Sequence, residues 1–440
     1  MRFRSTNSKN AAQENLVSFR DAVLDCLPED GGLYVPDKVM DIRQFFLYMD
    51  EQTTFPELVA AVAPSFLEDE LNPVSASIVA ESAFSFAPEL IQLDDDYSIL
   101  NLYNGPTGSY KDFGIAFLSA LLEQLRKDAG YSLVLAAVRG TTGASIAHAF
   151  SRRKGIGAVL IYPSGPIRGL DPAAFVPNGG NIIPIQVKGT FDDCQRLVNE
   201  TISDRKFSAR YSITSSNAIN PGRLLPQTFY YLYAFVKIKK RLSGGLVFSA
   251  PCGNFGNLMA GLYAWKFGMP VNGFVAAMNS NNSLGEFIKG GSFTPGQLII
   301  TNSPALDVRI PSNLSRLDSF YKESPAVMRN MVCPASISDE LTIEAIALAR
   351  SKYGIYIDPH TAVAFAAAQR FTEGADWKGN VHTVVLSTGH YSKAAGLIRE
   401  ATAENVTIPE DILSLQKRTD PIAIIPPNLN AFENVIATCF

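Results

Sequence analysis

The chain has 440 residues, 47% of them hydrophobic and 18% charged, with a formal net charge of −4. These values are typical of a globular protein with a large core, and the absence of any run of roughly 18 apolar residues excludes a chain that spans a membrane as a helix. The acidic balance and the dispersed basic residues argue against a nucleic acid or an acidic membrane as a partner.

The first 92 residues have mostly helical patterns, for example at Leu16–Leu27 and Pro56–Ala63, and they offer few groups for chemistry. The segment Gly31–Pro36 is a turn that enters an extended stretch. We predict that residues 1–92 form an N-terminal, mainly helical domain that covers the catalytic part. Because the N-terminus lacks the apolar core of a signal peptide, we expect a cytoplasmic protein.

From residue 93 onward, strand patterns alternate with helix patterns, which is typical of mostly parallel sheets with helices on both faces. Ser132–Val138 is a continuous apolar run of strand length, as expected of a strand buried on both faces. The predicted strands are 132–138, 158–162, 182–187, 211–214, 246–250, 273–278 and 382–388. We predict a small α/β domain at 126–220 and a large domain made of 93–125 and 221–440.

A tight turn that contains Gly105, Pro106 and Gly108 leads into Lys111 in the sequence LYNGPTGSYKDFG. The apolar pattern that follows predicts a helix over 113–125, so Lys111 would lie in its first turn. The positive end of the helix dipole and apolar neighbours disfavour the charged ammonium there, which leaves a neutral, nucleophilic amine. The alternative is a solvated lysine on the helix surface.

Polar loops follow the predicted strands at the edge where open parallel sheets bind ligands. The loop Arg139–Gly143, with the sequence RGTTG, follows the strand 132–138 and precedes a predicted helix at 144–150. Asn217 lies in an amide-rich stretch after another strand, and we expect a polar site residue, with a turn-forming asparagine as the alternative. The aromatic residues of a long predicted helix, 223–240, are expected to pack in the core.

A second glycine-rich turn, Gly253–Asn257, lies between the predicted strand 246–250 and a helical pattern. Strand, turn and helix in this order form an anion cup, because backbone N–H groups and the positive helix end converge there. The turn lacks both the Lys-Ser or Lys-Thr of a nucleotide P-loop and the Gly-x-Gly-x-x-Gly of a dinucleotide fold. An ordinary strand-to-helix loop is the alternative. Together with Lys111, the cup suggests pyridoxal phosphate, whose aldehyde takes a lysine and whose phosphate takes such a turn.

The five cysteines lack CxxC spacing, and the four histidines lack the spacing of metal ligands. We therefore predict reduced thiols and no metal site. A zinc-dependent mechanism is not expected on this basis.

Ordered motifs cover nearly the whole chain: RSTNSKN, GGLYVPD, NGPTGSYKDFG, SSNAINPGRLLPQ, PCGNFGN, DPHTAVAF and LSTGHYSK. In sequence and order they resemble the threonine synthase family of fold-type II pyridoxal-phosphate enzymes. The resemblance implies an α/β fold similar to the tryptophan synthase β subunit and a carbon–oxygen lyase of threonine biosynthesis. It implies Lys111 as the Schiff-base lysine and Thr388 as the residue that bonds the pyridine nitrogen. The implied phosphate cup consists of Gly253, Asn254, Phe255, Gly256 and Asn257.

The family's reaction converts O-phospho-L-homoserine and water to L-threonine and phosphate, so the resemblance implies a small amino-acid substrate with two anionic groups. Its α-carboxylate would be held by the loop residues Gly140, Thr141, Thr142 and Gly143. Its γ-phosphate needs cations, and the candidates are Arg139, Arg223 and Arg309, with Asp307 near the last. For Arg223, a surface position is the alternative. After release, Lys111 would be the base beside Cα and Cβ. We expect a monomer or a homodimer.

Several residues in the substrate motifs depart from the family's usual pattern. Arg139 and Thr141 stand where the family usually has serine and aspartate, which exchanges a negative charge for a positive one. Asn104 and Gly108 replace a histidine and a leucine, and Arg309 replaces a glycine. Threonine synthase is therefore one hypothesis. A second is a related enzyme that performs γ-replacement or phospho-elimination on another γ-substituted amino acid, and a third is a catalytically silent homologue.

Arg139 is the sharpest of these departures. A guanidinium does not lose its proton, so a buried arginine must meet an anion or an acidic side chain. The sequence leaves two alternatives open: Arg139 binds an anionic group of the substrate, or it pairs with a carboxylate inside the protein.

Overall fold

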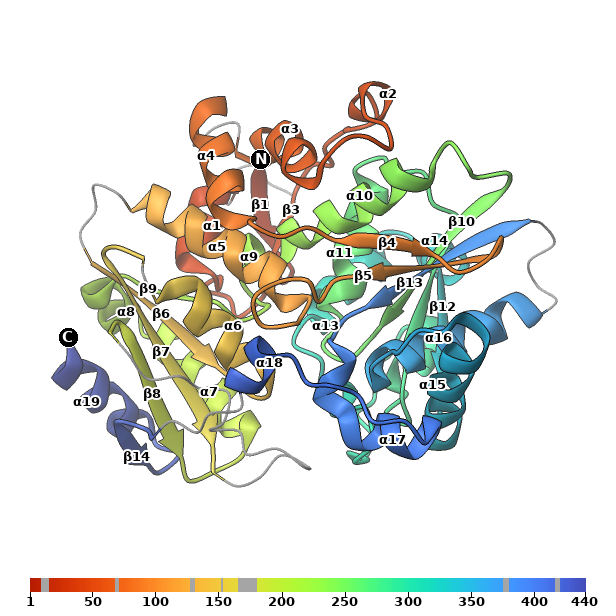
Figure 1. Ribbon diagram of the computed structural model, residues 1–440. Coiled ribbons are helices and arrows are strands. Elements are labelled where there is room, and N and C mark those ends of the chain that lie inside the picture. Colours follow the sequence, from red (N-terminus) through yellow and green to blue (C-terminus); the bar gives the residue numbers. More distant parts are fainter. Residues whose placement is uncertain are drawn as a thin grey trace.

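The computed structural model describes residues 1–8, 16–67, 71–126, 131–151, 153–164, 180–374, 380–415 and 420–440. Two open sheets stand side by side, each covered by helices, and a third, largely helical layer lies over their junction (Figure 1). This is the α/β architecture of mostly parallel sheets that the alternating pattern predicts. No helix in these described ranges is long and apolar enough to cross a membrane.

The larger sheet has six strands, and all its neighbours run parallel except the outer pair β4 and β5. In spatial order the strands are β12 (Val332–Ser336), β11 (Gly273–Met278), β10 (Gly245–Pro251), β13 (Val381–Ser387), β5 (Tyr97–Asn101) and β4 (Glu89–Gln92). The predicted strands at 246–250, 273–278 and 382–388 are confirmed to within one residue at each end. Their apolar runs are continuous because both faces are buried.

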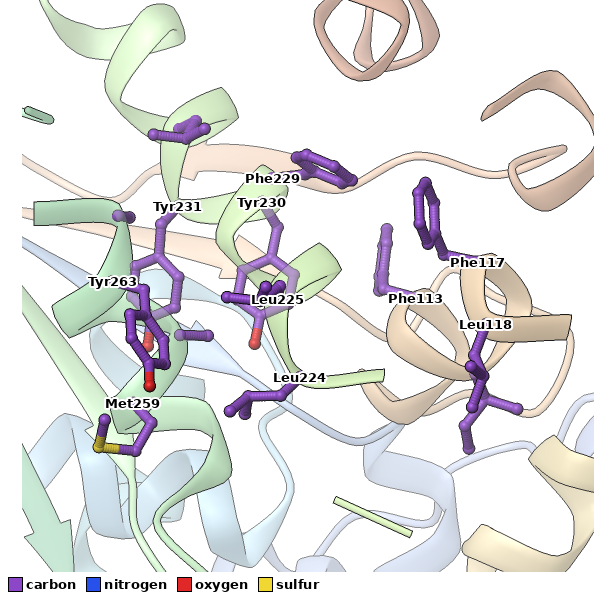
Figure 2. Packing of buried hydrophobic residues seen from close by; sticks show 14 of the residues in the cluster. Phe113, Phe117, Leu118, Leu224, Leu225, Phe229, Tyr230, Tyr231, Met259 and Tyr263 are labelled. Atoms are coloured by element: carbon purple, nitrogen blue, oxygen red, sulfur yellow. The ribbon is translucent and has the colours of Figure 1, made fainter. Parts of the chain in front are cut away.

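Helices cover both faces of the larger sheet. Along β10, Val247 packs with α16 (Pro359–Glu373) and α15 (Asp339–Tyr353), whereas Phe248 packs with the opposite cluster. That second cluster contains residues of α10 (Thr228–Ile238) and α11 (Gly256–Lys266), and Figure 2 shows Tyr231, Met259 and Tyr263 within it. Alternate residues of a strand face opposite sides of its sheet, so one strand anchors two helical layers.

The smaller sheet has five parallel strands. In spatial order they are β14 (Ala423–Ile425), β8 (Ile182–Val187), β7 (Ile156–Pro163), β6 (Ser132–Ala137) and β9 (Ile213–Ser215). The predicted strands at 132–138, 158–162, 182–187 and 211–214 are all present, with ends shifted by up to two residues. One face packs against α7 (Phe191–Ser203) and α19 (Leu429–Cys439), and the other against α6 (Thr141–Phe150).

The N-terminal layer is mainly helical, as expected, with α1 (Phe19–Asp25), α2 (Phe45–Tyr48), α3 (Phe55–Leu67) and α4 (Pro73–Ala83). A small antiparallel sheet, β2 (Val17–Ser18), β1 (Arg2–Ser5) and β3 (Tyr34–Pro36), accompanies these helices. Phe55 of α3 packs edge-on against Phe113 of α5 (Lys111–Leu125) and against Tyr233 of α10. The layer therefore buries the outer side of the helix that carries Lys111.

The remaining elements are short or peripheral. They are α8 (Arg205–Tyr211), α9 (Pro221–Leu224), η3 (Leu225–Gln227), α12 (Ser283–Gly290), η4 (Pro304–Leu306), α13 (Leu314–Glu323), α14 (Pro325–Met331), η5 (Tyr391–Ala394), α17 (Ala395–Thr402) and α18 (Glu410–Ser414). The α18 helix lies between the two sheets in Figure 1.

Two expectations about helices were wrong in detail. The single helix predicted over 223–240 is divided into α9, the 3₁₀ turn η3 and α10. Pro226 explains the break, because proline has no N–H for the helical bond to the residue four positions earlier. The helix predicted from residue 144 already begins at Thr141, so two of the loop's hydroxyl residues lie in its first turn.

Two strands depart from the expected domain limits. Glu89–Gln92 pairs with β5 in the larger sheet, although residues up to 92 were expected in the N-terminal domain. Ala423–Ile425 pairs with β8 in the smaller sheet, although residues 221–440 were expected in the large domain. The β14 segment lies far from β8 in the sequence, and local patterns cannot indicate such a pairing. The β4 and β5 strands form a local antiparallel hairpin, which the sequence analysis did not predict. We keep the three-domain division as a proposal, with these two strands reassigned.

Candidate active site

A cavity of about 990 Å³ lies between the two sheets, at the carboxyl ends of their strands. Its lining includes Ala137 at the end of β6, Pro251 at the end of β10 and Thr388 just after β13. Of the residues expected at the site, those that line it are Lys111, Arg139, Gly140, Thr141, Thr142, Asn217, Arg223, Gly253, Asn254, Phe255, Gly256, Asn257 and Thr388. Segments from five separate parts of the chain thus meet at one cavity.

Lys111 is the first residue of α5 and faces this cavity. The turn before it uses Gly108 at a φ of 58°, in the left-handed region that glycine adopts easily. Asp112 fastens the same turn, because its carboxylate accepts bonds from the Thr107 N–H at 2.9 Å and the Thr107 hydroxyl at 2.6 Å. The turn and the helix start therefore fix the backbone from which the Lys111 side chain enters the cavity.

The environment of Lys111 disfavours its charged form. Burial lowers the pKa of Lys111 to about 7, and the nearby positive charges of Arg223, Arg139 and Lys393 act in the same direction, whereas Asp112 opposes them. About half of the amine is then neutral near pH 7. The alternative of a solvated surface lysine is wrong for this residue, since it lines an internal cavity.

The glycine-rich turn Gly253–Asn257 forms a concave start to α11. Phe255, immediately before the helix, has a φ of 58°, which is strained for a residue with a side chain. The turn is fixed by a neighbouring loop: Asn254 accepts a bond from the Ser312 N–H through its side chain and from the Asn313 side chain through its carbonyl, both at 3.1 Å. The free N–H groups of the first helical turn remain for an anion.

Asn257 connects this turn to the aromatic core. Its side-chain oxygen accepts bonds from the hydroxyls of Tyr230 at 2.7 Å and Tyr231 at 3.1 Å, two residues that Figure 2 shows side by side. Its buried side-chain nitrogen has no partner among the described residues. The predicted core role of these tyrosines therefore includes fixing one residue of the anion cup.

Arg223 is a buried arginine at the cavity, only 6% exposed. The surface alternative for this residue is therefore wrong. Its guanidinium donates to the Ser216 carbonyl at 2.5 Å, and its buried Nε has no partner in the described part of the chain. Burial lowers the pKa of Arg223 to about 10, and Tyr110 opposes this shift. Such a cation is suited to bind an anion.

Arg139 bridges the two sides of the cavity. Its guanidinium lies 4.9 Å from the ring centre of Phe191 on α7 and donates to the Asp307 carbonyl at 3.1 Å. Burial lowers the pKa of Arg139, and the charges of Asp307 and Asp192 oppose that shift. Within the described residues, neither carboxylate forms an ion pair with it, so the internal ion-pair alternative is not realised in this structure.

Three residues expected at the site do not line the cavity: Gly143, Asp307 and Arg309. Gly143 lies inside α6. The Asp307 carboxylate is turned into the protein, where it accepts bonds from Thr301 at 2.7 Å and Asn279 at 2.8 Å. Arg309 is exposed, next to the exposed Ile310. These three residues lie near the cavity in sequence, but the path of the backbone directs them away from it, and residue type alone does not reveal that path.

The side chain of Asn217 is engaged with the backbone. Its oxygen accepts from the Ala137 N–H at 2.9 Å, and its nitrogen donates to the Ala137 carbonyl at 2.8 Å. These two bonds continue the pairing of β6 and β9 past Ser215, the last residue of β9. The side chain therefore has a structural role, as the turn-forming alternative expects. Its polar atoms border the cavity but already have partners.

Thr388 follows β13 directly and faces the cavity. Its N–H donates to the Thr361 hydroxyl at 3.3 Å, and its carbonyl accepts from the Tyr110 N–H at 3.1 Å. The latter bond ties the end of β13 to the helix start that carries Lys111.

Sequence reasoning assigned no role to several residues that line the cavity, namely Phe191, Ser312, Ser315, Asp358, His360 and Lys393. His360 donates through its Nδ1–H to the Asp358 carboxylate at 2.5 Å, and its Nε2 accepts from the Ala305 N–H at 3.1 Å. Asp358, His360 and Lys393 lie in the motifs DPHTAVAF and LSTGHYSK, so the signal for them was present. Within the described residues, no group of three or more His, Cys, Asp or Glu side chains is placed to hold a metal ion.

Family models match three consecutive parts of the chain. Residues 2–84 match the threonine synthase N terminus, residues 92–389 match the pyridoxal-phosphate dependent enzyme family, and residues 361–436 match the threonine synthase C-terminal region.

Similar proteins match over most of their length. The threonine synthase of Buchnera aphidicola subsp. Baizongia pistaciae is 32% identical over 91% of this chain and 92% of its own. That of Escherichia coli K12 is 31% identical over 94% of each chain, and its crystal structure superposes with a TM-score of 0.89 at 28% identity, covering both chains completely. The pyridoxal-phosphate-bound threonine synthase of Brucella melitensis superposes with a TM-score of 0.86 at 25% identity, covering 100% of this chain and 99% of that one.

Proposed function

Because this chain belongs to the threonine synthase family of pyridoxal-phosphate-dependent enzymes, we propose that its cavity converts O-phospho-L-homoserine and water to L-threonine and phosphate. The observation that carries this proposal is that Lys111, whose pKa is lowered by burial to about 7, shares its cavity with Arg223 and with the anion cup Gly253–Asn257. The Nε of Arg223 has no partner among the described residues. The cup and the arginine are two places for anions, which is what a phosphorylated cofactor and a phosphorylated substrate require together.

The residues present fit pyridoxal phosphate. Lys111 would hold its aldehyde carbon, the cup Gly253–Asn257 its phosphate, and Thr388 its pyridine nitrogen. The fit is supported by two features of the cup: the side-chain nitrogen of Asn257, which has no partner in the described part of the chain, and the strained backbone of Phe255. When bound, the cofactor supplies an electron sink that stabilises negative charge on the substrate carbons.

The roles of the protein groups follow from their positions. We assign the substrate's α-carboxylate to the start of α6, where Thr141 and Thr142 offer hydroxyls and Gly140, at a φ of 55°, lets the backbone approach. We assign its γ-phosphate to Arg223, with Arg139, which also lines the cavity, as a second cation. Lys111, with its pKa near 7, is suited to take protons from Cα and Cβ and to return them at Cγ and Cα. Phosphate leaves from Cγ, which gains a proton and becomes the methyl group, and water then supplies the hydroxyl at Cβ.

Steady-state turnover of O-phosphohomoserine tests this proposal. Phosphate release accompanied by threonine in amino-acid analysis is the expected result. Release of a 2-oxo acid, or of an adduct with another nucleophile, would instead assign the chain to γ-replacement or elimination. Purified protein should also show the visible absorbance of lysine-bound cofactor, and Lys111→Ala should lose it. A protein that stays colourless with added cofactor would overturn the site assignment.

We also propose that the enzyme acts in the cytoplasm, as a monomer or a homodimer, on a small amino-acid substrate. The support is the likeness to biosynthetic relatives of similar length. Light scattering of the purified protein distinguishes the two oligomeric states, and a larger assembly would contradict the proposal.

A further inference from the structure

Lys393 is a second lysine on the cavity wall, and the proposed reaction does not use it. It lies in η5, shortly after β13, and its side chain reaches back toward the turn that precedes Lys111. Its Nζ donates to the carbonyls of Thr107 at 2.5 Å and Gly108 at 2.7 Å. The ammonium of Lys393 thus binds neutral carbonyls, and it lies on the wall of the same cavity that Lys111 lines.

The end of the Lys393 side chain also packs against Gly108. A Cβ added to Gly108 would lie 3.4 Å from Lys393 Cε and 2.6 Å from Ile412 Cδ1 of α18, so the turn is enclosed on this side. The same turn is joined to the chain after β13 by two backbone bonds, His390 N–H to the Gly108 carbonyl at 3.0 Å and Tyr110 N–H to the Thr388 carbonyl at 3.1 Å. Lys393 therefore adds two side-chain bonds to the junction between the turn Gly105–Ser109 and the segment after β13.

We propose that Lys393 is a positioning residue for Lys111: it fixes the turn Gly105–Ser109 and, through its charge, keeps the Lys111 amine in the neutral, nucleophilic form. This inference rests on the proposed role of Lys111. A scaffold lysine could satisfy two carbonyls, but a neutral donor would do so as well without the cost of burying a charge. The charge itself is what acts on the neighbouring amine.

The groups that face the two lysines determine the balance of charge. Lys111 is faced by Arg223 on α9, Arg139 after β6, Lys393 and Asp112. Lys393 is faced by Asp112 and Asp358, and its own positive charge acts on His390. Burial lowers the pKa of Lys393 to about 8, while both carboxylates oppose this shift, so most of its amine stays charged at pH 7.

Two substitutions in the protein without cofactor separate the effect of the Lys393 charge from the effect of its hydrogen bonds to the turn. Lys393→Gln keeps an N–H donor for the carbonyls but removes the charge, and Lys393→Arg keeps both. The rate at which added pyridoxal phosphate develops its visible band is measured across pH, because an amine reacts with an aldehyde only when neutral. We expect Lys393→Gln to raise the midpoint of this pH dependence by about half to one pH unit, which slows the reaction roughly three- to tenfold at pH 6–7. Lys393→Arg should keep the original midpoint.

A matched control is Lys352→Gln, which removes an exposed lysine paired with Asp94 and should leave the midpoint unchanged. An unchanged midpoint in Lys393→Gln, with only a lower melting temperature, would overturn the proposal and make Lys393 a scaffold residue. Reductive ¹³C-methylation gives a second reading, since the Lys111 resonance reports its own titration without cofactor. If wild-type protein develops no band, the proposed function fails, whereas the ¹³C titration still decides the role of Lys393.

Discussion

Lys111 combines a reactive role with a cost to folding. In the unfolded chain its pKa is the ordinary 10.5, and in the folded protein it is about 7. Between these values the unfolded chain binds more protons than the folded one, so the stability of the protein rises with pH across this window. Below pH 7 the full cost of a charged, buried amine is present.

Replacing this lysine by an isosteric apolar residue should therefore stabilise the apo protein. For Lys111→Met we expect a gain on the order of 2–4 kcal/mol in the free energy of unfolding at or below pH 7, shrinking toward zero near pH 10.5. Urea unfolding across pH measures it. Lys111→Arg, which cannot become neutral, is the control and should be less stable than wild type. A gain from Lys111→Met that is the same at every pH would contradict the low pKa.

Arg139 shows what residue type alone can and cannot predict. Its chemistry predicts that Arg139 must have a partner, but not which one. The structure shows two partners, the Asp307 carbonyl and the ring of Phe191 on α7. We expect Arg139→Ala to weaken substrate binding or turnover by about 1.5–3 kcal/mol while leaving the cofactor spectrum intact. Arg139→Lys, which keeps the charge, should recover part of the loss in kcat/KM. Wild-type kinetics with a lowered melting temperature would identify a purely structural contact between the two sides of the cavity.

At the scale of elements, the strands were the most predictable part, because continuous apolar runs such as Ser132–Val138 are rare outside buried sheets. The cup Gly253–Asn257 was recognisable because its glycines and the helix after it are adjacent in sequence. The contacts that hold the cup could not be recognised in the sequence. They come from other elements, through Ser312, Asn313, Tyr230 and Tyr231. Local patterns cannot report contacts between distant segments, and for the same reason the junction at Lys393 was missed.

The anion cup should tolerate a side chain but not a negative charge. A Cβ at Gly256 would have its nearest neighbour, Asn313 Nδ2, at 3.4 Å, so a small residue fits. In Gly256→Asp, a carboxylate about 4 Å from a phosphate costs about 4 kcal/mol at an intermediate dielectric. Gly256→Asn has nearly the same shape without the charge and should bind cofactor much more tightly than Gly256→Asp. Titration of the visible band measures both affinities, and equal values would argue against a phosphate at this helix start.

At the scale of the whole molecule, the cavity exists only where two sheets meet, and the chain crosses between them several times. The last crossing brings β14 and α19 back to the smaller sheet (Figure 1). Phe432 and Ile436 of α19 are buried there with Leu197 and Val198 of α7. Because Phe191, at the start of α7, supports Arg139, the end of the chain contributes indirectly to one wall of the site.

Removing the main anchor of α19 should destabilise the smaller sheet. Phe432→Ala deletes a fully buried ring, and we expect a loss of about 3–5 kcal/mol. Hydrogen exchange should accelerate first in β8 and α7, before the larger sheet is affected. Asn434→Ala, at an exposed position on the same helix, is the control and should change exchange little. Uniform acceleration in both sheets would show that they unfold as one unit.

The pairing of β14 with β8 has a consequence during synthesis on the ribosome. β8 emerges long before β14, and every strand from β9 to β13 is translated between them, so one edge of the smaller sheet stays open while most of the polypeptide is made. An open, apolar edge strand such as Ile182–Val187 is a template for wrong pairing with another nascent chain. Products of premature termination keep that edge permanently, which makes them targets for chaperones and proteases rather than inactive but soluble fragments.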